Sequence, residues 1–72
     1  MDFPAMLKTL RTQNNVTQIQ LSKMFNISER NLRRYEKGEL EPTLSLLLLL
    51  ADYFNCSIDY LTGRTDNPEI NK

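Results

Sequence analysis

The sequence predicts an all-α fold, a compact five-helix bundle in a single domain. Residues that favour helix N-termini precede each of five apolar segments, and glycine or asparagine ends each of them. Within these segments, apolar residues recur at the three- and four-residue spacing of a helix face. The 72 residues suffice for one domain, close to the lower size limit for a core without disulfides or metals.

The first helix is predicted to begin after Asp2, which can cap it, with Pro4 in its first turn. Apolar residues at helical spacing define its buried face, with Arg11 as a further candidate: Phe3, Met6, Leu7 and Leu10. The polar pair at residues 14–15 is expected to end the helix.

Residues 16–38 predict two short helices joined by a tight turn. Thr17 can cap the first of them, and Gln20 can return a hydrogen bond to it, which makes a capping box. Val16 and Leu21 stand where a hydrophobic staple requires apolar residues, just before the cap and four residues after it. This arrangement fixes the start of the first helix of the pair.

The second helix of the pair is predicted between its cap, Ser28, and Gly38. Asn26 lies in the three-residue turn at 25–27 and can adopt the left-handed conformation that the corner needs. Two capped helices with such a turn are typical of a helix-turn-helix, which presents its second helix to the major groove of DNA.

Two more helices are predicted beyond the loop at 39–42. Thr43 is the expected cap of a helix that runs to about Phe54, where Asn55 stops it. Ser57 is the expected cap of a short helix over 58–62.

The domain is expected to span residues 1–63. Residues 64–72 lack apolar periodicity and contain Pro68, so we expect them to form a mobile tail. No internal repeat and no effector domain is expected in a chain of this length.

Composition argues against an enzyme. The chain has no histidine and one cysteine, so a zinc site, a disulfide within the chain and a Cys-His or Ser-His nucleophile are excluded. The longest apolar run, residues 46–51, is too short to span a bilayer, and no secretory signal is visible. We expect a cytoplasmic, nucleoid-associated binding module without cofactor, metal, membrane partner or small-molecule substrate. Cys56 is expected to be a small buried hydrophobe.

The charge is zero overall but strongly polarised along the chain. Residues 1–38 hold seven basic and three acidic residues, a net charge of +4, whereas residues 39–72 hold two basic and six acidic residues, a net charge of −4. The positive half contains the predicted helix-turn-helix. With few cations to displace phosphate counterions, we expect modest non-specific affinity for DNA.

Several motifs together resemble the phage repressor and Cro class of helix-turn-helix domains, also called Xre-like regulators. The resemblance covers residues 3 to about 63, through LKTLR, TQIQLS, the turn to Ser28, YEKG, LLADYF and CSIDYLTGRTDNP. It implies a lambda-repressor-like five-helix domain that binds operator DNA, usually as a symmetric dimer, with the docking geometry known for that class.

The resemblance also implies roles for individual residues. The positions that match base-reading residues are Glu29, Arg30, Arg33 and Arg34. Helical geometry agrees, because Leu32 and Tyr35 point inward, which leaves Glu29, Arg30 and Arg33 outward and Arg34 at the flank. The expected contacts to the DNA backbone are Thr17, Gln18, Ser28, Asn31 and Lys37, and Gln18 lies where helix amides favour a phosphate. A solvated helix face remains the alternative for the arginines, and a simple exposed polar residue the alternative for Gln18.

Arg11 and Glu36 match a partly buried ion pair of the class, which ties the first helix to the third.

Two departures from the class concern other segments. Glu39 and Glu41 occupy a loop that carries basic residues in some members, which lowers the affinity expected of a monomer.

The second departure is the unusually apolar fourth helix. One inward stripe consists of Leu47, Leu50, Ala51 and Phe54. A further stripe, Leu46, Leu49 and Tyr53, stands where polar residues are usual. Either this helix is buried more deeply than is typical, or the second stripe is exposed and forms a dimer surface.

We therefore predict a sequence-specific DNA-binding transcriptional regulator, a repressor that binds a palindromic operator in double-stranded DNA. It is expected to act as a homodimer in which the helix at 29–37 of each copy binds the operator. The alternative is a protein-interaction module of the same fold, of the antitoxin or anti-repressor type. The apolar fourth helix and the acidic second half favour that alternative.

Overall fold

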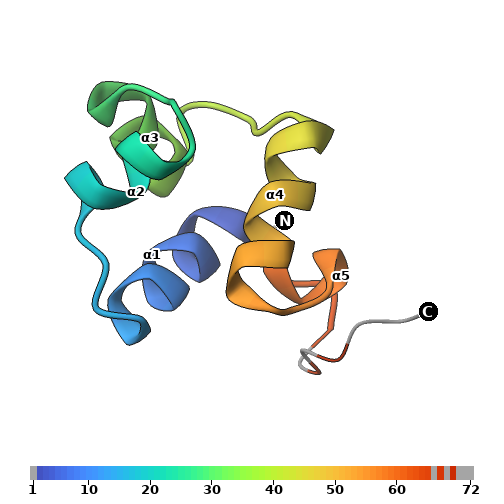
Figure 1. Cartoon of the computed structure of the whole chain (residues 1–72). Coiled ribbons are helices and arrows are strands. Elements are labelled where there is room, and N and C mark those ends of the chain that lie inside the picture. The colour runs from blue at the N-terminus through green and yellow to red at the C-terminus, as the bar shows by residue number, and fades with distance from the viewer. Residues whose placement is uncertain (1, 66, 68, 70–72) are drawn as a thin grey trace.

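Five α-helices fold around one apolar core in the computed structural model (Figure 1). The structure describes residues 2–65, 67 and 69. Its helices are α1 (Phe3–Gln13), α2 (Gln18–Met24), α3 (Glu29–Lys37), α4 (Leu44–Phe54) and α5 (Ile58–Leu61). The predicted all-α fold class is confirmed. Part of the expected mobile tail, namely residues 66, 68 and 70–72, lies outside the described residues.

Helix α1 lies between two helix pairs, α2 with α3 and α4 with α5 (Figure 1). Every helix contributes at least one fully buried side chain to the shared core: Phe3, Leu7, Leu21, Leu32, Leu50 and Leu61. In the part of the chain that the structure describes, no helix has the length and apolarity needed to cross a bilayer.

Local capping chemistry sets the start of four helices, as predicted. The side chains of Thr17, Ser28, Thr43 and Ser57 each accept a backbone N–H three residues later, at 3.0–3.1 Å. Gln20 completes the capping box by accepting the N–H of Thr17 at 2.9 Å. Each such cap stabilises its helix by ~1 kcal/mol. The corners are also as expected, since Asn26, Asn55 and Gly38 have φ of +54°, +54° and +78°.

The expected cap of the first helix is wrong. Asp2 stands at the N-cap position of α1, but its side chain accepts no capping hydrogen bond. Its backbone N–H instead donates to the carbonyl of Thr62 at 3.1 Å. This contact docks the start of the chain on the end of α5 and gives Asp2 a φ of −100° and a ψ of 30°, away from the extended backbone of a capping residue.

Helix α4 buries one side only. Leu46, Leu50 and Ala51 are buried, and Leu47 and Phe54 pack against the core. The prediction of Leu46 on an exposed stripe is therefore wrong. Leu46 lies one helical turn before Leu50 and two turns before Phe54, on the same inward side of α4. The outward side instead carries Leu44, Leu48, Leu49 and Tyr53, with exposures of 67%, 49%, 53% and 44%.

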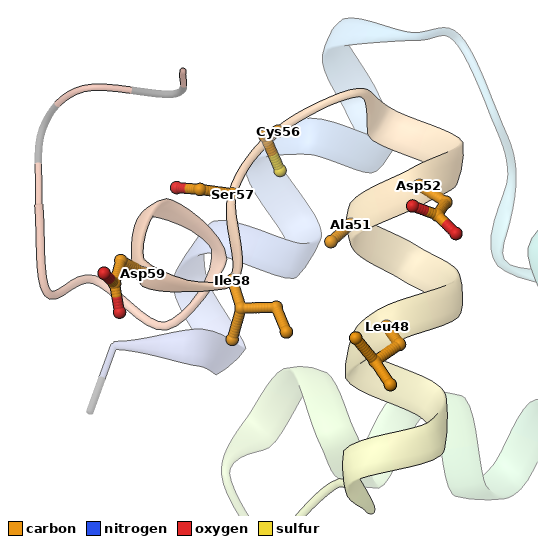
Figure 2. A pocket seen from close by; sticks show the side chains of 7 residues that line it. All are labelled: Leu48, Ala51, Asp52, Cys56, Ser57, Ile58 and Asp59. Atoms are coloured by element: carbon orange, nitrogen blue, oxygen red, sulfur yellow. The ribbon is translucent and has the colours of Figure 1, made fainter. Parts of the chain in front are cut away.

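A hollow of about 300 Å³ lies between α4 and α5. Figure 2 shows Leu48 and Ile58 in this hollow, with Asp52 on the α4 side and Asp59 on the α5 side. Cys56 also lines it but is only 3% exposed, and burial raises the pKa of its thiol. Cys56 is thus the small buried hydrophobe expected from the sequence.

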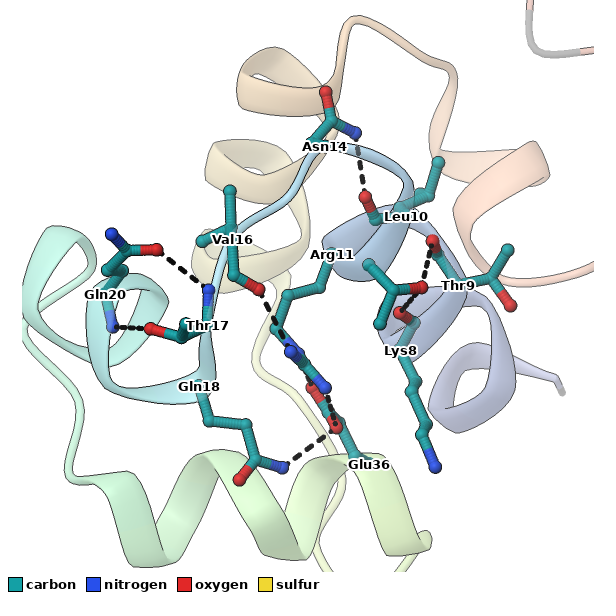
Figure 3. Close-up of polar contacts among 11 residues, drawn as sticks. Lys8, Thr9, Leu10, Arg11, Asn14, Val16, Thr17, Gln18, Gln20 and Glu36 are labelled. Carbon is teal, nitrogen blue, oxygen red and sulfur yellow. Dashed lines mark hydrogen bonds and ion pairs between the residues drawn. The ribbon is translucent and has the colours of Figure 1, made fainter.

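A buried ion pair ties α1 to α3 (Figure 3). The Arg11 guanidinium donates to both carboxylate oxygens of Glu36, at 2.7 and 3.2 Å, and to the carbonyl of Val16 at 3.0 Å. Gln18 Nε2 donates to the same carboxylate at 3.1 Å. The side chains of Arg11 and Glu36 are 11% and 5% exposed, so both charges depend on these hydrogen bonds in place of water.

We predict that Leu50→Ala lowers the free energy of unfolding by ~2–5 kcal/mol, because it opens a cavity in the core. Its neighbour Leu49 is exposed and provides the matched control. Leu49→Ala should change stability by less than ~0.5 kcal/mol. Urea denaturation of both variants in dilute solution measures the difference, and equal losses would contradict the orientation of α4.

We predict that Glu36→Ala or Arg11→Ala costs ~3–5 kcal/mol, because each leaves a buried charge without its partner. The double replacement Arg11→Met with Glu36→Leu should be much milder. Denaturation midpoints of the two single variants and the double variant give the comparison. Losses below ~1 kcal/mol in the single variants would mean that the pair behaves as a surface salt bridge.

Candidate nucleic-acid interface

Helix α3 has two chemically opposite faces. Leu32 and Tyr35 are buried, and the ring of Tyr35 meets Phe3 of α1 edge-on, with centroids 6.4 Å apart. Arg30 and Arg33 lie on the exposed side, whereas Arg34 is half-buried at the flank. The inward anchors hold the arginines in a fixed direction, away from the core.

The candidate base-reading residues are not independent of one another. Arg33 Nη1 donates to Glu29 Oε2 at 3.0 Å, and both side chains remain exposed to nearly half of their area. The sequence predicts the two residues as separate contacts, so their pairing is a finding of the structure. Their spacing of four residues on one helix was the signal that could have predicted it.

Gln18 occupies the first position of α2, as the phosphate role requires, but its side chain is half-buried and bonded to Glu36 (Figure 3). Nothing in the sequence indicated this contact, which joins residues 18 positions apart. A shallow hollow of about 440 Å³ beside it is lined by Arg11, Thr17, Gln18, Ile19 and Glu29. The hollow leaves the first turn of α2 open on the same side as Glu29.

The remaining candidate backbone contacts surround the two helix starts. The hydroxyl oxygens of Thr17 and Ser28 accept capping bonds, which leaves each O–H free to donate outward. Lys37 is exposed in the last turn of α3, and Asn31 is half-buried. Of the candidates, the structure brings Thr17 and Gln18 of α2 together with Glu29 of α3 around one hollow.

The site holds no metal-binding cluster: among the residues that the structure describes, no three His, Cys, Asp or Glu side chains come together. Every buried side-chain nitrogen or oxygen in that part of the chain has a hydrogen-bond partner. The exposed side chains of this surface offer N–H and O–H donors, with the Glu29 carboxylate as an acceptor.

Comparison with known proteins supports the helix-turn-helix fold. A family model described as Helix-turn-helix matches residues 7–61. The phage CTXphi transcriptional repressor RstR of Vibrio cholerae is 40% identical over 58 residues, which cover 81% of this chain and 52% of RstR. The transcriptional regulator ImmR of Bacillus subtilis is 33% identical over 66 residues, 92% of this chain and 52% of ImmR.

The regulator YobD of Bacillus subtilis, whose name marks it as uncharacterized, is 33% identical over 63 residues, 88% of this chain and 56% of YobD. The chain thus spans about half the length of these relatives. All three are named as transcriptional regulators, which confirms the expectation that this domain is not an enzyme. The chain belongs to the helix-turn-helix family, in its phage repressor and Cro class, the Xre-like regulators.

Proposed function

We propose that the chain is a sequence-specific DNA-binding transcriptional regulator, a repressor that inserts α3 into the major groove of operator DNA. The observation that carries this proposal is the outward arginine face of α3, held by a buried inner face and by the capped start of the helix. The positive charge of residues 1–38 directs this face toward phosphate. The name of its relative RstR supports the repressor role.

In this proposal the base edges are read by Glu29, Arg30, Arg33 and Arg34. The phosphate contacts come from Thr17, Gln18, Ser28, Asn31 and Lys37. Gln18 can keep its bond to Glu36 and offer its second Nε2 hydrogen to a phosphate oxygen in the adjacent hollow. Glu36 then orients Gln18 before DNA arrives, which lowers the entropic cost of that contact.

A homodimer on a palindromic operator completes the proposal. Two recognition helices about one DNA turn apart double the phosphate contacts of a weakly charged monomer. We place the dimer surface on the outward side of α4, at Leu44, Leu48, Leu49 and Tyr53. Figure 1 shows α4 and α5 on the other side of α1 from α2 and α3, so this surface leaves α3 free.

Charge favours an antiparallel contact between two copies of α4. In such a pair, centred on residues 48 and 49, Asp52 lies opposite the first turn of the partner's α4. The helix dipole stabilises a carboxylate there, and the two copies of Asp52 stay apart. The apolar surface also continues onto α2, because Tyr53 and Met24 line one hollow.

A protein-interaction module is the second candidate function. The hollow between α4 and α5 has an apolar floor with acidic residues at its edges, Asp52 and Asp59 (Figure 2). This chemistry suits a basic, partly apolar segment of another protein. Selection of DNA sites from a random pool distinguishes the candidates, since only the first predicts an enriched sequence.

We predict that Arg30→Ala weakens binding to the selected site by ~1–3 kcal/mol and relaxes the preference at one base pair. Lys37→Ala is the comparison. Lys37→Ala should weaken binding to all sequences about equally. It should also lower by about one the number of counterions released, which the salt dependence of binding measures. Fluorescence anisotropy on selected and scrambled duplexes measures both effects, and an equal loss on both duplexes for Arg30→Ala would contradict base reading by Arg30.

We predict that the native chain is a dimer by light scattering and that Leu48→Lys with Leu49→Lys makes it a monomer, because the new charges would be buried together. Thr9→Lys with Gln13→Lys adds the same charge to exposed positions of α1 and should leave the dimer intact. A native monomer at high concentration, or a dimer that survives the α4 change, would reject this interface.

A further inference from the structure

The ion pair between Glu29 and Arg33 lies in the middle of the proposed DNA-reading face. Arg33 Nη1 donates to Glu29 Oε2 at 3.0 Å, while the side chains are 48% and 42% exposed. Glu29 precedes its partner by four residues and stands in the first turn of α3. Both features favour the pair, because the helix dipole stabilises a carboxylate there and this order of charges is the better one.

We propose, resting on the DNA-binding function above, that Glu29 determines base specificity by positioning Arg33. The carboxylate holds the Arg33 guanidinium along the axis of α3, where it meets base edges and not the phosphate backbone. One N–H of Arg33 is used by Glu29, and the remaining N–H groups suffice for a bidentate contact to guanine O6 and N7.

The charge of the pair also favours contact between Arg33 and base edges over contact with phosphates. A free arginine beside DNA binds phosphates of any sequence and releases counterions, which raises non-specific affinity. The Arg33 charge is balanced by Glu29, so it adds little to that attraction. Arg30, on the same face, makes no ion pair within the described part of the chain and stays available to phosphate or base.

The pair also defines the kind of site that it reads. Glu29 Oε1 takes no hydrogen bond within the described part of the chain and can accept one from a cytosine amino group. Donors of Arg33 and an acceptor of Glu29 thus stand side by side. Neighbouring guanine and cytosine edges in the major groove are complementary to this arrangement.

The test uses the native chain and an operator selected from random DNA. Dissociation constants are measured on that operator and on a scrambled duplex, over a range of salt, for Glu29→Ala, Glu29→Gln, Arg33→Ala and the double alanine variant. We expect Glu29→Ala to reduce the ratio of selected to scrambled affinity roughly 5-fold to 100-fold. On scrambled DNA it should bind more tightly, with a salt dependence steeper by about one ion.

Two further variants separate the positioning of Arg33 from the effect of removing one negative charge. Glu29→Gln keeps an oxygen acceptor for Arg33 and should retain part of the base preference. Glu39→Gln removes the same charge from the exposed loop after α3 and should strengthen binding to both duplexes by the same factor. In the Arg33→Ala background, Glu29→Ala should cause a much smaller loss of specificity than in the native chain, namely only the part that comes from its own contact to cytosine.

Four results would overturn the proposal. Equal strengthening of both duplexes by Glu29→Ala would make Glu29 a repulsive charge only. An undiminished effect in the Arg33→Ala background would mean that Glu29 acts by itself. If the native chain selects no site, the proposed function fails and this inference falls with it. If the native chain selects a site and the ratio is unchanged in Glu29→Ala, this inference alone fails.

Discussion

The ion pair between Arg11 and Glu36 holds the helix-turn-helix in place on the rest of the domain. It joins α1 to α3, and its hydrogen bonds to Val16 and Gln18 also fix the entry to α2. Buried charges tolerate few arrangements, because a lost partner is not replaced by water. The position of α3 on the domain, and with it the direction of the arginine face, therefore depends on this network together with the buried side chains of Leu32 and Tyr35.

The surface of the domain divides along the same lines as its charge. The basic half carries the proposed DNA contacts, and the acidic half carries the apolar outward side of α4. Each half has one unfavourable property. Helix α3 has too few cations for tight binding as a monomer, and α4 leaves leucines exposed to water. The dimer proposed through α4 would meet both conditions with a single contact.

Much of the fold was predictable because helix capping and helix-ending residues act locally. Thr17, Ser28, Thr43 and Ser57 bond to amides three residues away, and Asn26 forms a corner by its own backbone conformation. The inward direction of Leu32 and Tyr35 likewise followed from helical spacing. The residues of the candidate interface came from the resemblance to the phage repressor and Cro class, with which helical spacing agreed. The pairing of Glu29 with Arg33 could have been predicted from their spacing of four residues.

The sequence by itself determined where four of the helices begin and which face of α3 points outward, since these depend on neighbours within one or two turns. Tertiary structure decided the rest. Leu46 lies at the boundary between the two sides of α4, and only the docking of that helix turned it inward. Asp2 lost its capping geometry to a contact with Thr62, and Gln18 gained Glu36 as a partner. These contacts join residues far apart in the chain, so their geometry exists only once the helices have packed together.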